Sequence, residues 1–586
     1  MYTVRFFRKQ WSNLISLSDN QIGLALLALL AGIASALVIT LFRLAIELPL
    51  VAFLPIDSPE SYEELGQWAR IALLGGGSLI LILLFHSLPR ERRGVGVSHV
   101  LQRMEMHQGY LPLPNIVVQW FAAAVAIVSG HSVGREGPAI HLGAGTASQI
   151  GQSVGLAHHR LRILAGAGVA SAISASFNTP MAGVIFAMEV VLLEYNIRGF
   201  VPIILASVAG AIVSEAVFGS HTAFAVPGVD MQSLAEIPYI LLLGIIAGLM
   251  AAAFIYLVRF FQRINHWPIW LKWGSLTCAT MVISWWLPQV MGIGYDTVNQ
   301  TLAGQVVMGS LLLLLAAKLL LASWAAGIGF PAGLIGPTLF IGAALGGLLG
   351  QLSDWWLPDY PVSVGFYAVL GMGAMMGAVL RAPLAALVAL LELTANPNII
   401  MPGMLAIVIA SLVVSEFFKL PSVFNVQLGG GHNYQAPDPV QQMLRNTWVA
   451  QAMSQSFVIA PRHITPETAG FMLQRDPEWL LLEKEKVILP PAAVAEALAD
   501  MKEKEEQKEK HAEDEHPDVD LISIPADRKQ VEFISLKANL QDALDLMQEH
   551  HIQWLAVYRD NDFSRCVGLV SQTQIEHFYH YMPRNQ

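Results

Sequence analysis

The chain of 586 residues is 54% hydrophobic and only 13% charged. Soluble proteins carry about 25% charged residues, so this composition excludes an ordinary soluble protein and indicates that most of the chain lies in lipid. The net charge of −10 reflects acidic residues after about residue 475, and we expect no nucleic-acid partner. Cys278 and Cys566 lie in regions of opposite character, which argues against a disulfide and against a cysteine metal site.

Long apolar segments and basic clusters predict how the chain sits in the membrane. The runs at 23–42, 71–88, 237–258 and 306–323 reach the roughly 17–25 residues that a membrane span needs. Basic residues precede the first run and recur between later ones, and by the positive-inside rule they face the cytoplasm. We therefore expect an integral, multi-pass protein of a bacterial-type inner or plasma membrane, with both termini cytoplasmic and the lipid bilayer as a partner.

Changes in composition divide the chain into three parts. Residues 1–20 form a cytoplasmic N-terminal segment, and residues 21–435 form the membrane domain. Residues 445–586 have the composition of a soluble α/β domain, with a charged linker at about 502–520. In this tail, Thr465 and Asn539 are typical helix caps, each followed by an apolar strand.

The membrane part contains an internal repeat. The stretch GREGPAIHLGAGTASQIGQ at 134–152 aligns with GLIGPTLFIGAALGGLLGQ at 333–351, and three further matches occur in the same order. Paired halves whose hydrophobic segments are interrupted by Gly and Pro at corresponding places indicate a transporter site at the repeat interface. The fold class that we predict is an all-α polytopic membrane protein of two inverted-topology halves, built from broken and tilted helices, followed by the small α/β domain.

The stretch Gly134–Pro138 carries the most informative chemistry. Pro138 suits the first turn of a helix. A helix that begins inside the membrane directs unpaired N–H groups and the positive end of its dipole at one spot, which attracts an anion. The carboxylate of Glu136 can occupy that spot itself and leave it to another anion when it is protonated or displaced. An ionisable residue at membrane depth is costly and therefore indicates function.

Two further glycine motifs are placed to join this site. The repeat partner, 333–337, carries no charge and offers the backbone N–H groups of Leu334 and Ile335 at a second helix start. The motif 94–98 follows a basic cytoplasmic cluster and can approach the centre of the membrane from the cytoplasmic side. Its position is the one reason to assign it to the anion site.

The order of these motifs, together with the run at 177–183 and Arg381-Ala-Pro-Leu, resembles the CLC family of chloride channels and chloride/proton antiporters. The resemblance covers roughly residues 20–430. It implies a homodimer with one anion pathway per subunit and Glu136 as the external gating glutamate. It also implies that the tail is a pair of CBS modules. The anion-binding residues that we expect are Val95, Gly96, Arg135, Gly137, Leu334, Ile335 and Phe424.

Departures from the family pattern affect the anion site and the proton path. Val95 stands where the family has a serine and Phe424 where it has a tyrosine, so both hydroxyl ligands of the central anion are missing. Val190 stands where proton-coupled members carry an internal glutamate. This favours passive, uncoupled conduction, with chloride/proton exchange as the alternative. Glu189, Glu194, Glu105 and His99 are candidates for a substitute proton path, although Glu189 has a counterpart in the other half and is better explained as structural.

Other functions fit the sequence less well. A CBS-containing divalent cation transporter needs carboxylates or carbonyls at the midplane, and the membrane part has few acids. An intramembrane enzyme is opposed by the lack of a His-Glu-x-x-His signature, and we expect no enzyme activity and no metal. We expect chloride or a similar monovalent anion as the substrate, and no cofactor. The tail reads Gly568 to Gln574, where Gln574 replaces the acid of nucleotide-binding CBS modules, so adenine nucleotide is not supported there.

Overall fold

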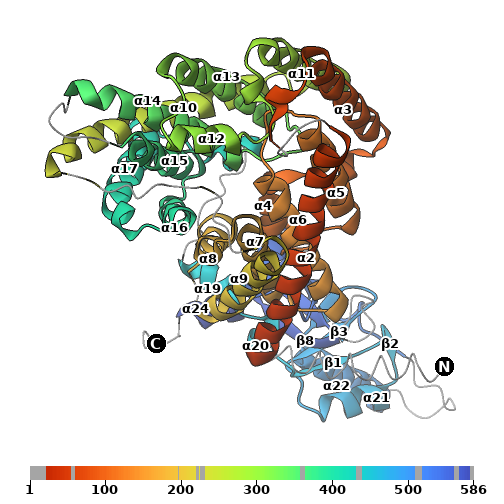
Figure 1. The fold of residues 1–586 in the computed structure, drawn as a ribbon. Coiled ribbons are helices and arrows are strands. Elements are labelled where there is room, and N and C mark those ends of the chain that lie inside the picture. Colours follow the sequence, from red (N-terminus) through yellow and green to blue (C-terminus); the bar gives the residue numbers. More distant parts are fainter. Residues whose placement is uncertain are drawn as a thin grey trace. The chain divides into compact units, whose positions relative to one another are not determined.

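The computed structural model describes residues 21–54, 60–195, 197–219, 224, 231, 233–356, 363–429, 439–507, 518–559 and 566–580. The predicted N-terminal segment and residues 508–517 of the predicted linker lie outside this part of the chain. The chain divides into a helical unit that ends at Ala436 and a unit of mixed helices and strands that begins at Pro437 (Figure 1).

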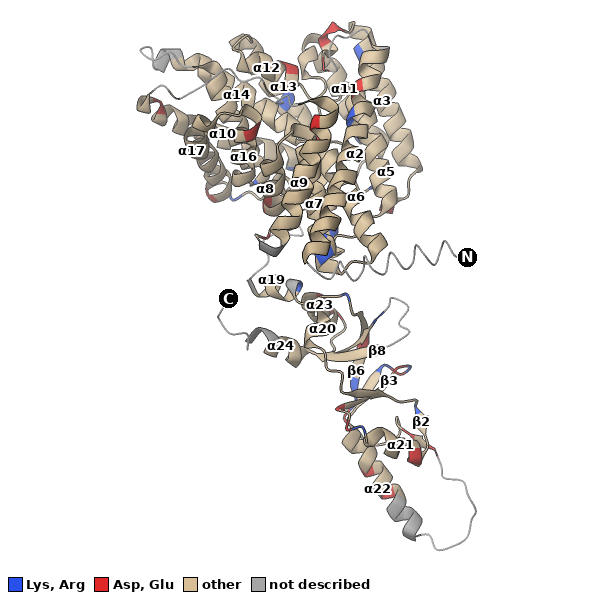
Figure 2. Ribbon diagram, turned by 60° about the horizontal axis from the view of Figure 1, so that its bottom comes forward, with Lys and Arg blue, Asp and Glu red and all other residues tan. Residues whose placement is uncertain are grey.

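The first unit is built from helices that carry few charged residues (Figure 2). Among the described residues, seven helices are long and apolar enough to cross a membrane, and several shorter ones lie between them. The described helices are α2 (Gln21–Phe53), α3 (Gln67–Ser87), α4 (Gly96–Met106), α5 (Leu113–Val128), α6 (Glu136–Val154), α7 (His158–Phe177), α8 (Pro180–Phe186), α9 (Ile197–Phe218), α10 (Ile237–Gln262), α11 (Ile269–Trp286), α12 (Tyr295–Leu302), α13 (Met308–Gly327), α14 (Ile335–Trp356), α15 (Val364–Leu380), α16 (Pro383–Thr394), α17 (Ile400–Leu412) and α18 (Val423–Gln427).

Glycine packing makes the internal repeat visible in three dimensions. In the first half, a Cβ on Gly143 of α6 would lie 2.4 Å from the carbonyl oxygen of Gly168 of α7. In the second half, a Cβ on Gly342 of α14 would lie 2.4 Å from the carbonyl oxygen of Gly371 of α15. Only glycine permits this backbone approach, and small residues drive helix packing where lipid provides no hydrophobic force. The two predicted halves therefore use the same helix pair, and the predicted fold class is confirmed.

In each half, a glutamate side chain accepts hydrogen bonds from the backbone of the other half. Glu392 accepts hydrogen bonds from the backbone N–H groups of Met181 (2.8 Å) and Ala182 (2.7 Å) at the start of α8. Glu189, in a π-helical turn over Ala187–Leu192, accepts from Leu384 (3.2 Å) and Ala385 (2.7 Å) at the start of α16. Each glutamate thus caps the first turn of a helix in the opposite half, where the helix dipole favours negative charge.

The second unit contains a six-stranded sheet in the order β1-β3-β4-β6-β7-β8 and a separate pair, β2 and β5. The pairs β1/β3 and β6/β7 are parallel, whereas β3/β4, β4/β6 and β7/β8 are antiparallel. The predicted caps Thr465 and Asn539 accept hydrogen bonds from Thr468 N–H and Asp542 N–H. The elements are α19 (Pro439–Asn446), α20 (Val449–Ala452), β1 (Phe457–Ile459), β2 (His463–Ile464), α21 (Pro466–Leu473), β3 (Trp479–Leu482), β4 (Val487–Leu489), α22 (Pro491–Gln507), β5 (Val519–Asp520), β6 (Lys529–Ser535), α23 (Leu540–Glu549), β7 (Trp554–Tyr558), β8 (Cys566–Ser571) and α24 (Gln572–His580).

Candidate functional site

The starts of α6 and α14, one from each half, meet directly. Gly134 and Gly333 form a two-residue antiparallel bridge, in which each N–H donates to the other's carbonyl oxygen at 2.7 and 2.8 Å. A Cβ on Gly137 would lie 2.7 Å from the Cα of Gly333, so this contact also requires glycine. The bridge fixes two helix N-termini side by side, with their unpaired N–H groups in one region.

Glu136 occupies the start of the opposite helix. Its side chain is buried, at 1% exposure, and its Oε2 accepts a hydrogen bond from the backbone N–H of Gly336 at 3.1 Å. Gly336 is the second residue of α14. A carboxylate at that position is stabilised by the hydrogen bond and by the positive end of the helix dipole. The carboxylate therefore holds the place that a mobile anion would take.

Tyr295 holds the other oxygen of the same carboxylate. Its hydroxyl donates to Oε1 of Glu136, and the ring is almost fully buried. Tyr295 begins α12 directly after Gly294, whose φ of 89° requires glycine, and its backbone N–H donates to Glu60 Oε2 at 2.5 Å. Tyr295 is not among the site residues predicted from the sequence. The available signal was the glycine pair Gly292 and Gly294, which matches Gly94 and Gly96 in the other half.

Two cations, the partly buried Arg135 and the fully buried Lys318, lie close to this arrangement. The Arg135 guanidinium is 5.6 Å from the centre of the Tyr295 ring and 3.4 Å from Glu47 Oε1. Lys318 of α13 has no exposed surface, and its ammonium donates to the carbonyl oxygens of Val290 (3.2 Å) and Gly292 (2.8 Å). Arg135, which is predicted to bind the anion, contacts the Glu47 carboxylate and is not among the wall residues of the cavity described next.

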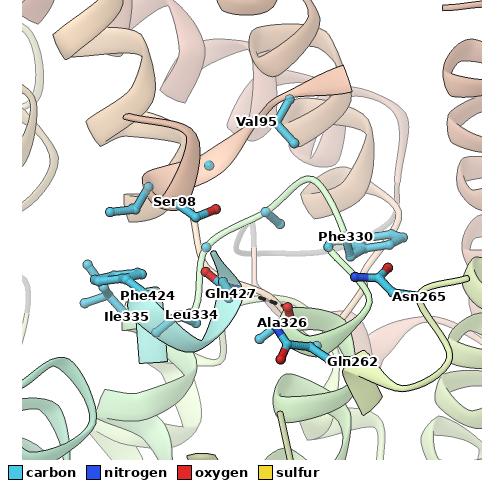
Figure 3. Close-up of a pocket in the computed structure, with 17 residues that line it drawn as sticks. Val95, Ser98, Gln262, Asn265, Ala326, Phe330, Leu334, Ile335, Phe424 and Gln427 are labelled. Carbon is cyan, nitrogen blue, oxygen red and sulfur yellow. Dashed lines mark hydrogen bonds between the residues drawn. The ribbon is translucent and has the colours of Figure 1, made fainter. Parts of the chain in front are cut away.

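A cavity of about 80 Å³ lies at the meeting point of the helix starts (Figure 3). Its described walls carry no charged side chain; the polar ones are Ser98, Gln262, Asn265 and Gln427. An anion in it would depend on backbone N–H groups, amides and one hydroxyl. Of the residues predicted to bind the anion, those that line it are Val95, Gly96, Gly137, Leu334, Ile335 and Phe424.

The hydroxyl of Ser98 is the one hydroxyl among the described wall residues, and Figure 3 shows its oxygen directed toward the enclosed space. It lies in the same cavity wall as Val95 and Phe424, which carry no hydroxyl. Gly96 also lines the cavity, and its N–H donates to Gln119 Oε1 at 2.5 Å. Gln119 is fully buried and also donates to Pro331 O at 3.4 Å. It therefore joins the glycine motif of the first half to the loop before α14.

The comparison with protein families decides the classification. A family model described as voltage gated chloride channel matches residues 77–415, which is more than half of the chain. The chain belongs to this family. A model of the CBS domain matches residues 522–580, within the α/β unit.

Family members named as exchangers and as channels resemble the chain to a similar degree. The H(+)/Cl(−) exchange transporter ClcA of Vibrio cholerae is 27% identical over 441 residues, which cover 73% of this chain and 90% of that protein. The voltage-gated ClC-type chloride channel ClcB of Salmonella typhi is 25% identical over 410 residues, 68% of this chain and 97% of that protein. The crystal structure of a slow cyanobacterial Cl−/H+ antiporter shares the fold, with a TM-score of 0.61 and 20% identity over 69% of this chain and 97% of that one.

In this family member, the residues considered for a proton path are held by other contacts. Val190 is buried, and Glu189 caps α16 as described above. Glu194 lies 3.5 Å from Arg162 in a buried ion pair. His99 of α4 joins a residue that the sequence analysis overlooked, because its Nδ1 is 2.8 Å from Nε2 of His141 on α6.

In the CBS region, Gln574 stands at the position of the nucleotide-binding acid. Its side-chain oxygen accepts from the backbone N–H of Ser571 at 2.8 Å, and the Ser571 hydroxyl accepts from the N–H of Gln574 at 3.1 Å. The pair caps the start of α24, so the amide oxygen of Gln574 already has a structural partner.

Proposed function

We propose that this chain transports chloride or a similar monovalent anion across a membrane, with Glu136 as the gate. The observation that carries the proposal is the hydrogen bond from Gly336 N–H to the buried Glu136 carboxylate. The same N–H group suits a halide, because it is a helix-start donor in a site that excludes water. Carboxylate and anion compete for one place.

The mechanism follows from that competition. With the carboxylate on the start of α14, the anion is confined to the neutral cavity beside Ser98 and Leu334. When Glu136 takes up a proton, its charge no longer matches the helix start, and the side chain leaves the position. An anion from the cavity then occupies the vacated N–H group. Return of the carboxylate expels it.

The sequence alone favours uncoupled conduction, but the first candidate that we propose is proton-coupled exchange. In it, uptake of a proton by Glu136 accompanies each release of the carboxylate, and the anion moves in exchange. The V. cholerae relative named as an H(+)/Cl(−) exchange transporter supports this candidate. Uncoupled conduction is the second candidate, and the specific observation in its favour is the buried Val190 at the place of the internal glutamate. The ClcB relative named as a channel agrees with it.

Proteoliposomes with crossed gradients of chloride and pH test the two candidates. For exchange, a chloride gradient drives protons uphill, and the reversal potential depends on both ions in a fixed ratio. A reversal potential that follows chloride alone would establish uncoupled conduction and reject exchange. Glu136→Gln is the control, because it keeps the shape of the side chain and removes its titration; its proton flux should vanish while anion flux remains. An absence of anion flux in every condition would reject the proposal as a whole.

The assembly that we propose is a homodimer in the inner membrane with both termini in the cytoplasm. The family resemblance supports the dimer, and the basic clusters support the orientation. Chemical cross-linking in native membranes should give a band at twice the monomer mass. A protease added to the outside of spheroplasts should leave both ends of the chain intact.

A further inference from the structure

A second, larger cavity lies apart from Glu136. Its volume is about 710 Å³, and it is formed by the end of α3, the loop after it and the segment that leads into α11. The described wall residues are Phe85, His86, Arg90, Arg93, Asn265, His266, Trp267, Pro268, Ile269, Trp270, Lys272, Trp273 and Gly329. Cavities of roughly 300–1,000 Å³ accommodate drug-sized ligands, so this one is much too large for a single halide ion.

The walls are basic and carry no carboxylate among the described residues. Arg93 donates to the carbonyl oxygen of Leu88 at 2.9 Å, and Lys272 donates to Asn265 Oδ1 at 2.8 Å. Within the described part of the chain, Arg90, Arg93 and Lys272 form no ion pair with an acidic side chain. Three positive charges therefore line one cavity without a counter-ion among the described residues.

Three tryptophans line the cavity together with these charges, next to and within the first turns of α11. Trp267 and Trp270 are 38% and 60% exposed, although large aromatic residues usually avoid water. Trp273 is 2% exposed, and its indole N–H has no acceptor among the described residues. Tryptophan is enriched at the level of lipid headgroups, where its apolar ring and polar N–H meet different surroundings. The cavity thus combines an apolar wall, a buried free donor and a cationic rim.

We propose that this cavity binds the phosphate headgroup of an anionic phospholipid. Basic pockets between membrane helices on the cytoplasmic side suit such headgroups, and the basic loop at 90–93 is cytoplasmic by the positive-inside rule. Arg90, Arg93 and Lys272 bind the phosphate oxygens, and the exposed tryptophans contact the glycerol and the upper acyl chain. Asn265 and Gly329 also line the cavity of about 80 Å³ at the helix starts, so a bound headgroup lies beside the proposed anion pathway.

Native mass spectrometry of the full chain in mild detergent tests this assignment. The protein is exposed to equal amounts of phosphatidylglycerol and phosphatidylethanolamine, and the retained lipid is counted. Each basic side chain near a membrane surface strengthens the attraction of an anionic lipid about fivefold. The variant Arg90→Gln/Arg93→Gln/Lys272→Gln should therefore bind phosphatidylglycerol on the order of 100-fold more weakly.

The matched control removes three exposed cations that do not line the cavity, Arg92→Gln/Arg263→Gln/Lys419→Gln, and should retain the lipid like the wild type. The wild-type preference is informative without any variant: equal retention of both lipids contradicts the proposal. Loss of retention in the control to the same extent also contradicts it. A further arm adds inorganic phosphate at millimolar concentration. If phosphate displaces the lipid completely, the cavity is a site for free anions, and the lipid assignment is wrong.

Discussion

Replacing Tyr295 by phenylalanine removes one hydroxyl and leaves the rest of the site in place. The hydroxyl donates to Oε1 of Glu136, whereas the ring packs against Arg135, with 5.6 Å between the guanidinium and the ring centre. A hydrogen bond to a charged group contributes about 1.5–3 kcal/mol. Its loss shifts the equilibrium between the bound and the released Glu136 side chain by about 10- to 150-fold toward release.

Anion flux from proteoliposomes at neutral pH measures this shift. In the wild type, most Glu136 side chains hold the start of α14, so flux is limited by the released fraction. Tyr295→Phe should raise flux at least about 10-fold, up to the ceiling set by Glu136→Gln in the same lipid. The flux of Glu136→Gln sets the upper limit, because in that variant the side chain is already released and flux cannot rise further.

Tyr367 offers a matched control elsewhere in the molecule. It is also fully buried, and its hydroxyl donates to Glu236 Oε2 at 3.2 Å. Tyr367→Phe removes the same group from a similar hydrogen bond and should leave flux unchanged. Unchanged or lower flux in Tyr295→Phe, at normal protein yield, would refute the argument that Tyr295 holds the gate shut.

Three further predictions follow from the contacts of single side chains. Glu136→Gln should abolish the dependence of anion flux on external pH, because the group that takes up the proton is gone; flux that still follows pH like the wild type contradicts the gating role. Ser98→Ala should weaken chloride binding about 10-fold by calorimetry, because a hydrogen bond to the anion is lost, whereas Ser98→Thr should retain affinity. Glu189→Gln and Glu392→Gln should each lower the stability of the protein by about 1–3 kcal/mol in thermal denaturation, because each glutamate caps a helix of the opposite half. Neither variant should change the ratio of ions transported.

The pattern of glycines made the architecture predictable. Glycines at positions 134, 143, 333 and 342 are the points where backbones touch, and their spacing repeats in the sequence because the same helix contacts occur twice. Glu136 was recognisable for a related reason, since a charged residue between glycines at membrane depth has few structural explanations. These features depend on local sequence and on repetition within one chain.

The partners of Glu136 were harder to predict, because they depend on tertiary contacts. Tyr295 lies 159 positions away in the sequence. The repeated glycines at 292 and 294 mark its neighbourhood, but no feature of the sequence pairs its hydroxyl with Glu136. Arg135 is adjacent to Glu136 and is predicted to bind the anion, and its contact with Glu47, 88 positions away, was not predictable from the sequence. Gly96 was identified correctly as a wall residue, yet only the structure shows that Gln119 occupies its N–H group.

The central claim is that the Glu136 carboxylate and the transported anion compete for the start of α14. Anomalous diffraction from crystals of Glu136→Ala grown in bromide locates the anion directly. The account predicts a bromide peak within hydrogen-bonding distance of Gly336 N, which is absent or much weaker in wild-type crystals. A bromide peak of equal strength at that position in both proteins, or none there in Glu136→Ala, would contradict it.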